Sequence, residues 1–562
     1  MLVGGLIIAL LAGACVGWGA LTWSLVGRLS DRPVGRTLVG ELGLIGILTI
    51  GALATALHFV VPLGGEIAIA IGLVGLAAGG LAARRGLGFE RPRGRTFAAL
   101  GVIASALAAS GLGTRIGYDA GLYHLPVQQW IREEPIVIGF ANLHHRFGFN
   151  SMHEVLSSLL WLEPGDLRLI TLGEQLYVFF VIIAVLETAL TTRDRSIAPA
   201  ALGLLAFVSF AAFNDYYSIA ITFNDNAVGF LFIAVAIAAL RAADASRTTD
   251  ERRGAVGAVL FLSALAVALK ASAATLIVLV VALLVIGVRS SLLTIRAAGG
   301  MVGVGALMLL PTVVRGYLMS GCLAFPSASS CVGDVSFSAS EGAEEATDLI
   351  VGWARTPHTP VGFRADVLAG REPWIDIWWE RTDREIVWLL MIFAAISIVT
   401  WLISPYLGLR RERHASMDQV AVALVLTEVA ALGFWWTQAP DTRFGIGALH
   451  LATVLPAALA LRHLRIADRA QSRLLGAFAV PIVVLAAFSV TGLEPTGRSA
   501  IETPVFPAEI EIPEAVVVPN AAGGVRPEDS DQCWLTPSPC VPFETEFELD
   551  SWGPYTVVRP VD

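Results

Sequence analysis

The sequence predicts an all-α polytopic membrane protein with about fourteen transmembrane helices. Two observations carry this prediction. Of the 562 residues, 55% are hydrophobic and only 15% are charged, whereas soluble globular proteins contain about 25% charged residues. Apolar runs such as residues 2–27 and 272–288 are also suited to crossing about 30 Å of hydrocarbon as helices.

The apolar segments give the expected helices in order. The first covers residues 2–27, and we expect it to be retained because it lacks the basic region that precedes the apolar core of a cleaved signal peptide. The other predicted helices cover residues 38–62, 64–83, 96–112, 170–190, 197–213, 218–240, 254–270, 272–288, 296–315, 386–405, 417–436, 444–461 and 474–492.

Lysine and arginine gather in short connections on one side of this alternation. Seven connections hold 23 of the 38 basic residues, an excess that is typical of cytoplasmic loops. We therefore expect both termini and the long loops to be extracytoplasmic, in a protein of the bacterial cytoplasmic membrane. The seven connections are residues 28–37, 84–95, 191–196, 241–253, 289–296, 409–416 and 462–473.

Six parts follow along the chain. They are N-terminal transmembrane helices (1–112), a first extracytoplasmic loop with the candidate active site (113–169), a transmembrane core (170–315), a second extracytoplasmic loop (316–385), C-terminal transmembrane helices (386–492) and an acidic tail (493–562). The first loop reads as short helices interrupted by prolines, and tryptophans at the end of the second suit a helix in the membrane interface. The tail alternates polar and apolar residues in FETEFEL, which predicts a small cap with some β-structure.

Four of the five cysteines fall in the parts expected to lie outside. They are Cys322, Cys331, Cys533 and Cys540. An even number of exported cysteines favours disulfides in an oxidising compartment. Four cysteines allow three pairings, and we favour the local one, Cys322 with Cys331 and Cys533 with Cys540.

The stretch GYDAGLYHLPVQQW, at the start of the first loop, interrupts a hundred mostly apolar residues. Asp119 lies just past the fourth predicted helix, where a fixed carboxylate can accept a proton from an attacking hydroxyl. Tyr123 shares a helical face with Asp119 at the i+4 spacing, and His124 could bind a phosphate or a metal. The structural alternative is that Asp119 caps the following helix.

Four of the nine histidines lie between residues 124 and 153. His144 and His145 are adjacent, so on one helix their side chains diverge by roughly 100° and do not chelate a metal together. No H-x₃₋₅-H or HExxH spacing of a zinc site occurs here. The residues indicate no dedicated metal site, although a divalent cation, Mg²⁺ or Mn²⁺, held by Asp119 with phosphate oxygens stays open.

Three cations are placed by the sequence near the outer ends of helices. Lys270 is the single lysine of the chain, and Arg315 and Arg443 lie where predicted helices end or begin. Arginine beside a membrane surface is suited to binding phosphate with two hydrogen bonds. The alternatives are a side chain that reaches to the membrane interface, or an ion pair such as Arg443 with Asp441.

The motifs DAGLYHLP, GFANLHHRFGFNS, RGYLMSG, APDTRFG and CWLTPSPC resemble a group of large bacterial membrane proteins attached to the GT-C superfamily of membrane glycosyltransferases. The resemblance spans positions 119–540. It implies a GT-C-like fold, a polyprenyl-phosphate sugar donor, an extracytoplasmic glycan, lipid or protein acceptor, and an inverting displacement. It also implies that Asp119, at the acidic position of the first outer loop, is the general base.

On this reading the membrane lipids and the lipid-linked donor are the partners, and nucleic acid is not. Lys270, Arg315 and Arg443 would bind the donor phosphate. Residues expected to contact substrate are Tyr123, His124, His144, His145, Asn150 and Asp225. Two departures from the GT-C pattern stand out, because the motif follows the fourth predicted helix rather than the first and Asp119 has no acidic neighbour at 118 or 120.

Other functional classes share some of these features. A transporter or flippase of lipid-linked glycans would also have many helices, but its substrate residues usually lie near the midplane of paired repeats. No repeat is visible here, and Glu428 and His58 are the main mid-helix ionisable residues. A non-catalytic scaffold of envelope assembly, and a glycan polymerase or ligase, are the remaining alternatives.

Overall fold

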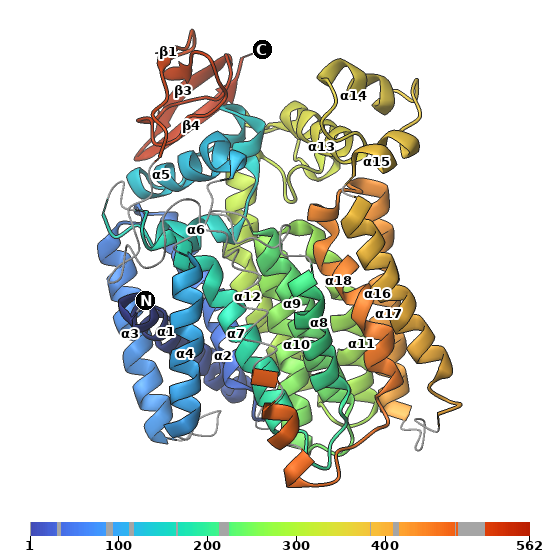
Figure 1. Cartoon of the computed structure of the whole chain (residues 1–562). Coiled ribbons are helices and arrows are strands. Elements are labelled where there is room, and N and C mark those ends of the chain that lie inside the picture. The colour runs from blue at the N-terminus through green and yellow to red at the C-terminus, as the bar shows by residue number, and fades with distance from the viewer. Residues whose placement is uncertain are drawn as a thin grey trace.

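A computed structural model gives the architecture of the chain (Figure 1). It describes residues 2–30, 35–85, 94–111, 117–163, 167–212, 224–382, 384–407, 415–471, 473–477, 479–480 and 512–561. Apolar helices run side by side in a tall bundle, and two separate lobes rise from one end of it (Figure 1). One lobe contains the strands and the other contains α13, α14 and α15.

Thirteen of the predicted helices coincide with helices of the structure. For the fourteenth, residues 469–471, 473–477 and 479–480 are helical, and the rest of that prediction lies outside the described residues. Residue 225 rather than 218 begins the described part of α9. The thirteen are α1 (Leu2–Leu29), α2 (Val39–His58), α3 (Gly65–Arg85), α4 (Gly94–Gly111), α7 (Ile170–Leu190), α8 (Ala198–Ala212), α9 (Asp225–Ala243), α10 (Thr249–Leu269), α11 (Leu276–Arg289), α12 (Ile295–Ser320), α16 (Arg384–Ile403), α17 (Ala415–Gln438) and α18 (Thr442–Ala460).

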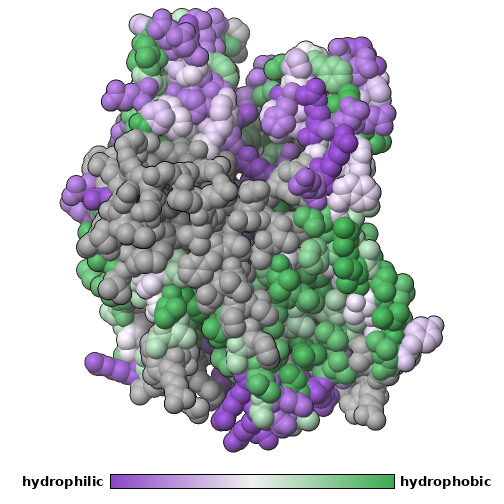
Figure 2. Space-filling model, viewed as in Figure 1, coloured by the Kyte–Doolittle hydropathy of each residue, from purple (hydrophilic) through white to green (hydrophobic). Residues whose placement is uncertain are grey.

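The helices have the length and polarity of membrane spans. Ten helices of the described chain are long and apolar enough to cross a membrane, and three more apolar helices are shorter. In the view of Figure 2, apolar side chains cover the right-hand side of the bundle below the outer lobes, and hydrophilic residues gather on the lobes and at the opposite end. The chain is therefore a multi-pass membrane protein.

Helix α9 is the centre of the bundle. The most apolar 18-residue stretch of α9 is 100% buried, against 28% for the stretch that contains α11 and 39% for that of α17.

Small residues let other helices of the bundle approach closely, as they do in membrane proteins generally. A Cβ on Gly46 of α2 would lie only 1.7 Å from the carbonyl oxygen of Cys15 on α1, so α1 and α2 pack backbone against backbone.

The first outer loop folds into short helical pieces between α4 and α7. These are η1 (Ala120–His124), α5 (Leu125–Glu133), η2 (Phe140–Asn142), η3 (His145–Gly148) and α6 (Met152–Ser158). The first of them is a π-helical turn. Short helices were predicted here, but Pro126 lies in the first turn of α5 and does not interrupt a helix.

The other two outer parts form the lobes. The second loop contains η5 (Ala328–Ser330), α13 (Ser340–Arg355), α14 (Val361–Leu368) and α15 (Ile375–Arg381). The tail forms two antiparallel hairpins, β1 (Val517–Pro519) with β2 (Val525–Pro527), and β3 (Phe547–Trp552) with β4 (Tyr555–Pro560). The expected cap with some β-structure is confirmed. Both disulfides have the predicted local pairing, Cys322–Cys331 and Cys533–Cys540.

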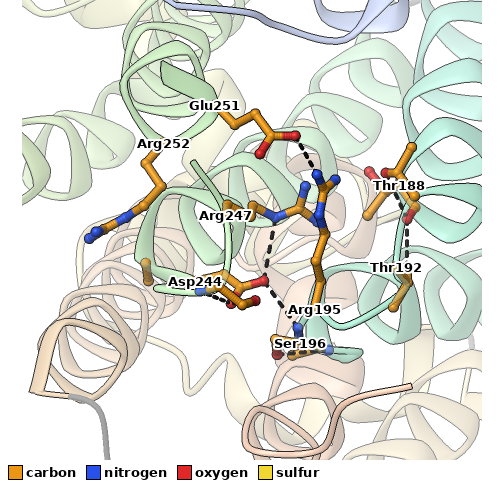
Figure 3. A network of polar contacts seen from close by, with 12 residues as sticks. Thr188, Thr192, Arg195, Ser196, Asp244, Arg247, Glu251 and Arg252 are labelled. Atoms are coloured by element: carbon orange, nitrogen blue, oxygen red, sulfur yellow. Dashed lines mark hydrogen bonds and ion pairs between the residues drawn. The ribbon is translucent and has the colours of Figure 1, made fainter. Parts of the chain in front are cut away.

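A network of charged residues holds the connections at the opposite end of the bundle (Figure 3). The Asp244 carboxylate accepts a hydrogen bond from the Ser196 amide at 3.0 Å and lies 3.5 Å from Arg247. Arg195 pairs with Glu251 at 2.6 Å. Burial, followed by repulsion from the other arginines, lowers the pKa of Arg247 to about 9. These contacts join the connection between α7 and α8 to that between α9 and α10.

Candidate active site

Four charged side chains from distant parts of the sequence meet at the outer end of the bundle. They are Asp119, Asp225, Lys270 and Arg443, and we call them the charge network. Arg443 donates from Nε to Asp225 Oδ2 at 2.7 Å and from Nη2 to Asp119 Oδ2 at 2.9 Å. The Lys270 ammonium pairs with the other oxygen of Asp225. Arg443 therefore bridges two carboxylates, and Lys270 shares one of them.

Helix ends position the members of this network. Asp225 is the first residue of α9, where the helix dipole favours a carboxylate. Lys270 directly follows α10 in an extended conformation that turns its side chain away from the helix path. Arg443 is the second residue of α18, and its amide donates to the side chain of the N-cap residue Asp441 at 2.8 Å.

Two tryptophans hold the turn that leads to Arg443. The Trp435 indole donates to the carbonyl of Asp441 at 2.7 Å, and the Trp378 indole donates to that of Pro440 at 2.5 Å. Trp378 belongs to α15 and also packs on Trp436 of α17. The tryptophans expected in an interface helix therefore dock the second outer loop on the outer end of α17.

The first outer loop is tied to the same place by Ser151 and Asn224. The Ser151 hydroxyl donates to the carbonyl of Leu269 at 2.7 Å, and the Asn224 amide donates to that same carbonyl at 2.7 Å and to Ser151 Oγ at 3.0 Å. Asn224 and Leu269 directly precede Asp225 and Lys270 in the sequence. The position of the charge network is thus fixed relative to the first loop.

The charge network is open on one side. The side chains of Lys270 and Arg443 are 24% and 37% exposed, that of Asp119 is 17% exposed, and that of Asp225 is only 7% exposed. Arg146 approaches the second oxygen of Asp119 at 3.5 Å. Asp119 thus has a cation on each side, and the two cations of the network face an accessible space.

A cavity of about 50 Å³ lies beside this network. Asp225, Lys270 and Arg443 form its charged wall, and aromatic residues such as Phe434 and Phe444 form much of the rest. The Lys270 ammonium lies 4.7 Å from the Phe444 ring centroid, a favourable cation–π contact. Asp119 does not line the cavity itself, but it contacts Arg443, which does.

The cavity borders the apolar outer surface of the bundle. Phe434 of α17 lines the cavity and is 45% exposed. On the neighbouring helix α11, Ile277 and Val281 are more than half exposed. An amphiphilic ligand could place an anionic group on Lys270 and Arg443 while its apolar part lies against these helices.

Comparison with known proteins identifies a family for the chain. A family model described as a domain of unknown function, DUF8201, matches residues 1–450. The chain belongs to the DUF8201 family. No curated protein matches it.

The DUF8201 chain is also similar to two solved membrane-protein structures. The arabinosyltransferase EmbB from Mycobacterium smegmatis shows 14% identity and a TM-score of 0.35, with 70% of this chain and 33% of EmbB covered. ArnT from Cupriavidus metallidurans, solved with undecaprenyl phosphate, shows 14% identity and a TM-score of 0.28, with 66% and 77% covered. The chain spans about a third of the length of EmbB.

Tyr123 and His124 of the DUF8201 chain lie behind Asp119. The partly buried Tyr123 ring stacks beside His124 at 4.0 Å and meets Phe149 edge-on at 5.8 Å. Burial, reinforced by the negative charge of Asp119, raises the pKa of Tyr123 well above its ordinary value. The Tyr123 hydroxyl therefore stays protonated, and the ring supports the turn that carries Asp119.

His124 is buried in a hydrogen-bonded group with Glu154. Its Nδ1 lies 2.6 Å from Glu154 Oε1, and Gln128 donates to the other oxygen at 2.7 Å. Burial raises the pKa of Glu154, but the His124 charge and hydrogen bond outweigh this effect, so the net pKa lies below its ordinary value. His124, predicted to contact substrate, instead joins η1 to α6.

His144 and His145 are also buried rather than open to substrate. Their rings stack at 4.2 Å, His144 lies 5.7 Å from Phe543 of the tail, and His145 lies 3.7 Å from Glu345 of α13. Burial, with repulsion from Arg146, lowers the pKa of His145 to about 4. These histidines lie between the two outer lobes, which explains their polarity without a ligand.

Asn150 and Arg315 form a second buried group. Arg315 donates to Asn150 Oδ1 at 2.8 Å, and Asn150 donates to the carbonyl of Thr312 at 2.5 Å. Arg315 is only 2% exposed. The sequence predicted that Arg315 lies at the outer rim with Lys270. Helix α12 continues five residues past Arg315, so this arginine lies inside the bundle and not at the helix end.

The carboxylates of the site do not fit a divalent cation. Among the residues that the structure describes, no group of three or more His, Cys, Asp or Glu could hold a metal ion. Asp119 and Asp225 both bind the Arg443 guanidinium, which lies between them. The positive charge of this guanidinium disfavours a divalent cation between the two carboxylates.

Arg146 is the main site residue that the sequence reasoning missed. It approaches Asp119 and lies 6.0 Å from the centroid of the Tyr123 ring. One signal was present, because the tripeptide Arg-Phe-Gly occurs both at 146–148 and at 443–445. The arginines of both copies contact Asp119.

Proposed function

We propose that this DUF8201 protein is a GT-C-type membrane glycosyltransferase. It would move a sugar from a polyprenyl-phosphate donor to an extracytoplasmic acceptor with inversion at the sugar. One observation carries the proposal: Arg443 contacts Asp119 on one side and lines the cavity with Lys270 on the other. The candidate base is therefore in direct contact with Arg443, one of the two cations proposed to bind the phosphate.

The donor would bind with its phosphate on Lys270 and Arg443 and its lipid along the apolar faces of α11 and α17. The half-open cations and the exposed Phe434 support this orientation. A phosphate that binds Arg443 competes with Asp119 for the same guanidinium. Donor binding would thereby leave Asp119 with Arg146 alone and give it room to accept a proton.

In the displacement, an acceptor hydroxyl oxygen forms a bond to the anomeric carbon as the bond from that carbon to the phosphate oxygen breaks. Asp119 takes the hydroxyl proton, and the polyprenyl phosphate leaves with the electron pair. Lys270 and Arg443 stabilise the charge that develops on the departing phosphate, which is commonly a large catalytic contribution. The base contributes about 10²- to 10⁴-fold in comparable enzymes.

The test compares Asp119→Asn with wild type in nanodiscs. Radiolabelled polyprenyl-phosphate sugars serve as donors, and extracted bacterial envelope fractions serve as acceptors. We expect Asp119→Asn to lower transfer by about 100-fold or more with unchanged melting. The matched control is Asp366→Asn, which removes an exposed carboxylate paired with Arg371 on α14 and should transfer normally.

Normal transfer by Asp119→Asn would exclude the assigned base. Lys270→Met should weaken donor binding and lower turnover, because the phosphate loses one of its two cations. A liposome assay separates the main rival function. Movement of labelled lipid between leaflets without sugar transfer would identify a flippase and contradict the proposal.

A further inference from the structure

The C-terminal segment docks on the first outer loop beside Asp119. Strand β4 pairs with Ile138, whose amide donates to the carbonyl of Thr556 at 2.9 Å and whose carbonyl accepts from Val558 at 2.8 Å. The Thr556 hydroxyl donates to Glu134 at 2.6 Å. In Figure 1 the strands accordingly lie directly above α5.

A second contact reaches the turn that carries Asp119. It comes from residues 531–540, the Cys533–Cys540 loop, which the disulfide closes. The Trp534 amide donates to the carbonyl of Gly121 at 3.0 Å, and the Tyr118 hydroxyl donates to Asp531. Asp119 lies between these two attachment points in the sequence.

Gly121 fits the loop so closely that a side chain would not be accommodated. A Cβ at this position would lie 2.4 Å from Gln532 Oε1 and 2.5 Å from the Trp534 ring. Trp534 itself has a φ of +50°, a left-handed conformation that is uncommon for a bulky residue. The loop is therefore shaped to bring this indole against Gly121.

The helical turn itself explains why the loop is needed. In η1 the Leu125 amide donates to the carbonyl of Ala120, five residues earlier. The next donor in this pattern, residue 126, is proline and has no N–H. The carbonyl of Gly121 therefore lacks the corresponding helical donor, and the Trp534 amide takes its place.

We propose that the Cys533–Cys540 loop positions Asp119, with Trp534 and Asp531 clamping the turn on both sides of that carboxylate. The loop does not touch the reacting atoms in this assignment. An effect of the loop on the rate of sugar transfer rests on the proposed glycosyltransferase function. Its effect on the stability of the helical turn that carries Asp119 does not. The loop lies outside residues 1–450, the part that the family model matches.

Hydrogen exchange of the full-length protein in nanodiscs tests the clamp directly. The variant is Trp534→Gly, because glycine adopts a positive φ without strain. We expect exchange in residues 117–125 to become about ten-fold faster, as local opening becomes easier, while β3 and β4 keep their protection. The matched control is Trp552→Gly, which removes an indole that is 72% exposed in the same lobe.

Unchanged exchange in residues 117–125 would overturn the proposal, and so would an equal effect of Trp552→Gly. Gly121→Ala provides a second variant from the other side of the contact, with Gly333→Ala as control because no atom lies within 4 Å of a Cβ there. Gly121→Ala should also raise exchange in 117–125, and protection equal to wild type would contradict the clamp.

Transfer kinetics then separate positioning from general stability. Trp534→Gly should lower kcat about ten-fold or more with little change in the donor KM, because the cations that bind phosphate are not in the loop. A change in donor KM alone would contradict a positioning role for Asp119. If wild type shows no transfer with any donor, the proposed function fails, while the exchange result still decides whether the loop clamps the turn.

Discussion

His153 acts as a neutral packing residue between the first outer loop and the bundle. His153 of α6 is 2% exposed and lies 3.3 Å from the Ser157 hydroxyl. Burial and the neighbouring His124 lower its pKa to about 4, although Glu154 and Asp225 oppose the change. Glu174 of α7 lies 3.9 Å from the same ring. Burial is the main cost of protonating His153, because it would place a charge in this contact between the loop and the bundle.

This arrangement predicts an acid-sensitive outer loop. The unfolded chain takes up protons near pH 6.5 and the folded His153 only near pH 4, so stability is present above pH 6.5 and is lost as the pH falls toward 4. The gap corresponds to roughly 3 kcal/mol for one histidine. His153→Gln should lose less stability than wild type between pH 7 and pH 4.5, measured by thermal melting.

Equal acid sensitivity of wild type and His153→Gln would show that this histidine does not carry the effect. His358→Gln is a suitable control. That histidine lies in the second loop with its ring 5.1 Å from Trp353, and its replacement should leave the pH dependence of wild type unchanged.

At the scale of elements, a buried ion pair locks α2 to α9. Glu41 and Arg241 have side chains that are each 1% exposed and lie in contact. Glu41 also accepts hydrogen bonds from the Thr37 hydroxyl at 2.5 Å and from the Leu38 amide at 3.1 Å. The pair joins the start of α2 to the end of the most deeply buried helix.

Removal of one partner should cost far more than removal of both. Arg241→Ala leaves the Glu41 charge buried and should destabilise the protein by about 3–5 kcal/mol. The double variant Arg241→Met with Glu41→Leu should melt much closer to wild type, since apolar replacement of a buried pair is often neutral. The measurement is thermal melting in detergent, and equal losses for the single and double variants would contradict this account.

The sequence predicted the helices well because long apolar runs leave the chain few alternatives in a membrane. It also placed Asp119, Lys270 and Arg443 at the outer ends of helices. In the structure Arg443 contacts Asp119, and both Arg443 and Lys270 contact Asp225. It did not predict the depth of Arg315, because α12 continues five residues past the predicted end. Nor could it reveal the contact of Gly121 with Trp534, which depends on how two segments 413 residues apart dock.

At the scale of the whole molecule, the two outer lobes lie at the same end of the bundle (Figure 1). The Asp244–Arg247 network follows the C-terminal end of α9, whereas Asp225 of the charge network begins that helix, so the two networks lie at opposite ends of the bundle. This agrees with the predicted topology, in which successive connections between helices lie on alternate sides of the membrane. The excess of lysine and arginine in the connections at the second end leads us to propose that this end faces the cytoplasm.

Single-cysteine labelling tests that orientation. Cys15 is buried and the other four cysteines are in disulfides, so wild type should react little with a membrane-impermeant maleimide. Glu344→Cys, exposed on α13, should be labelled in intact cells. Ala245→Cys, exposed between α9 and α10, should be labelled only after permeabilisation, and the reverse pattern would invert the topology.

Under the proposed function, the contact of Arg443 with both Asp119 and Asp225 has a consequence for the state before the donor binds. While the Arg443 guanidinium binds both aspartates, a water that enters the cavity meets Arg443, which lines it, and not Asp119, which does not. Only an anion that binds the Arg443 guanidinium would free the Asp119 carboxylate to accept a proton. Such an interlock would spare the costly lipid-linked sugar from hydrolysis and make loading of the donor precede that of the acceptor.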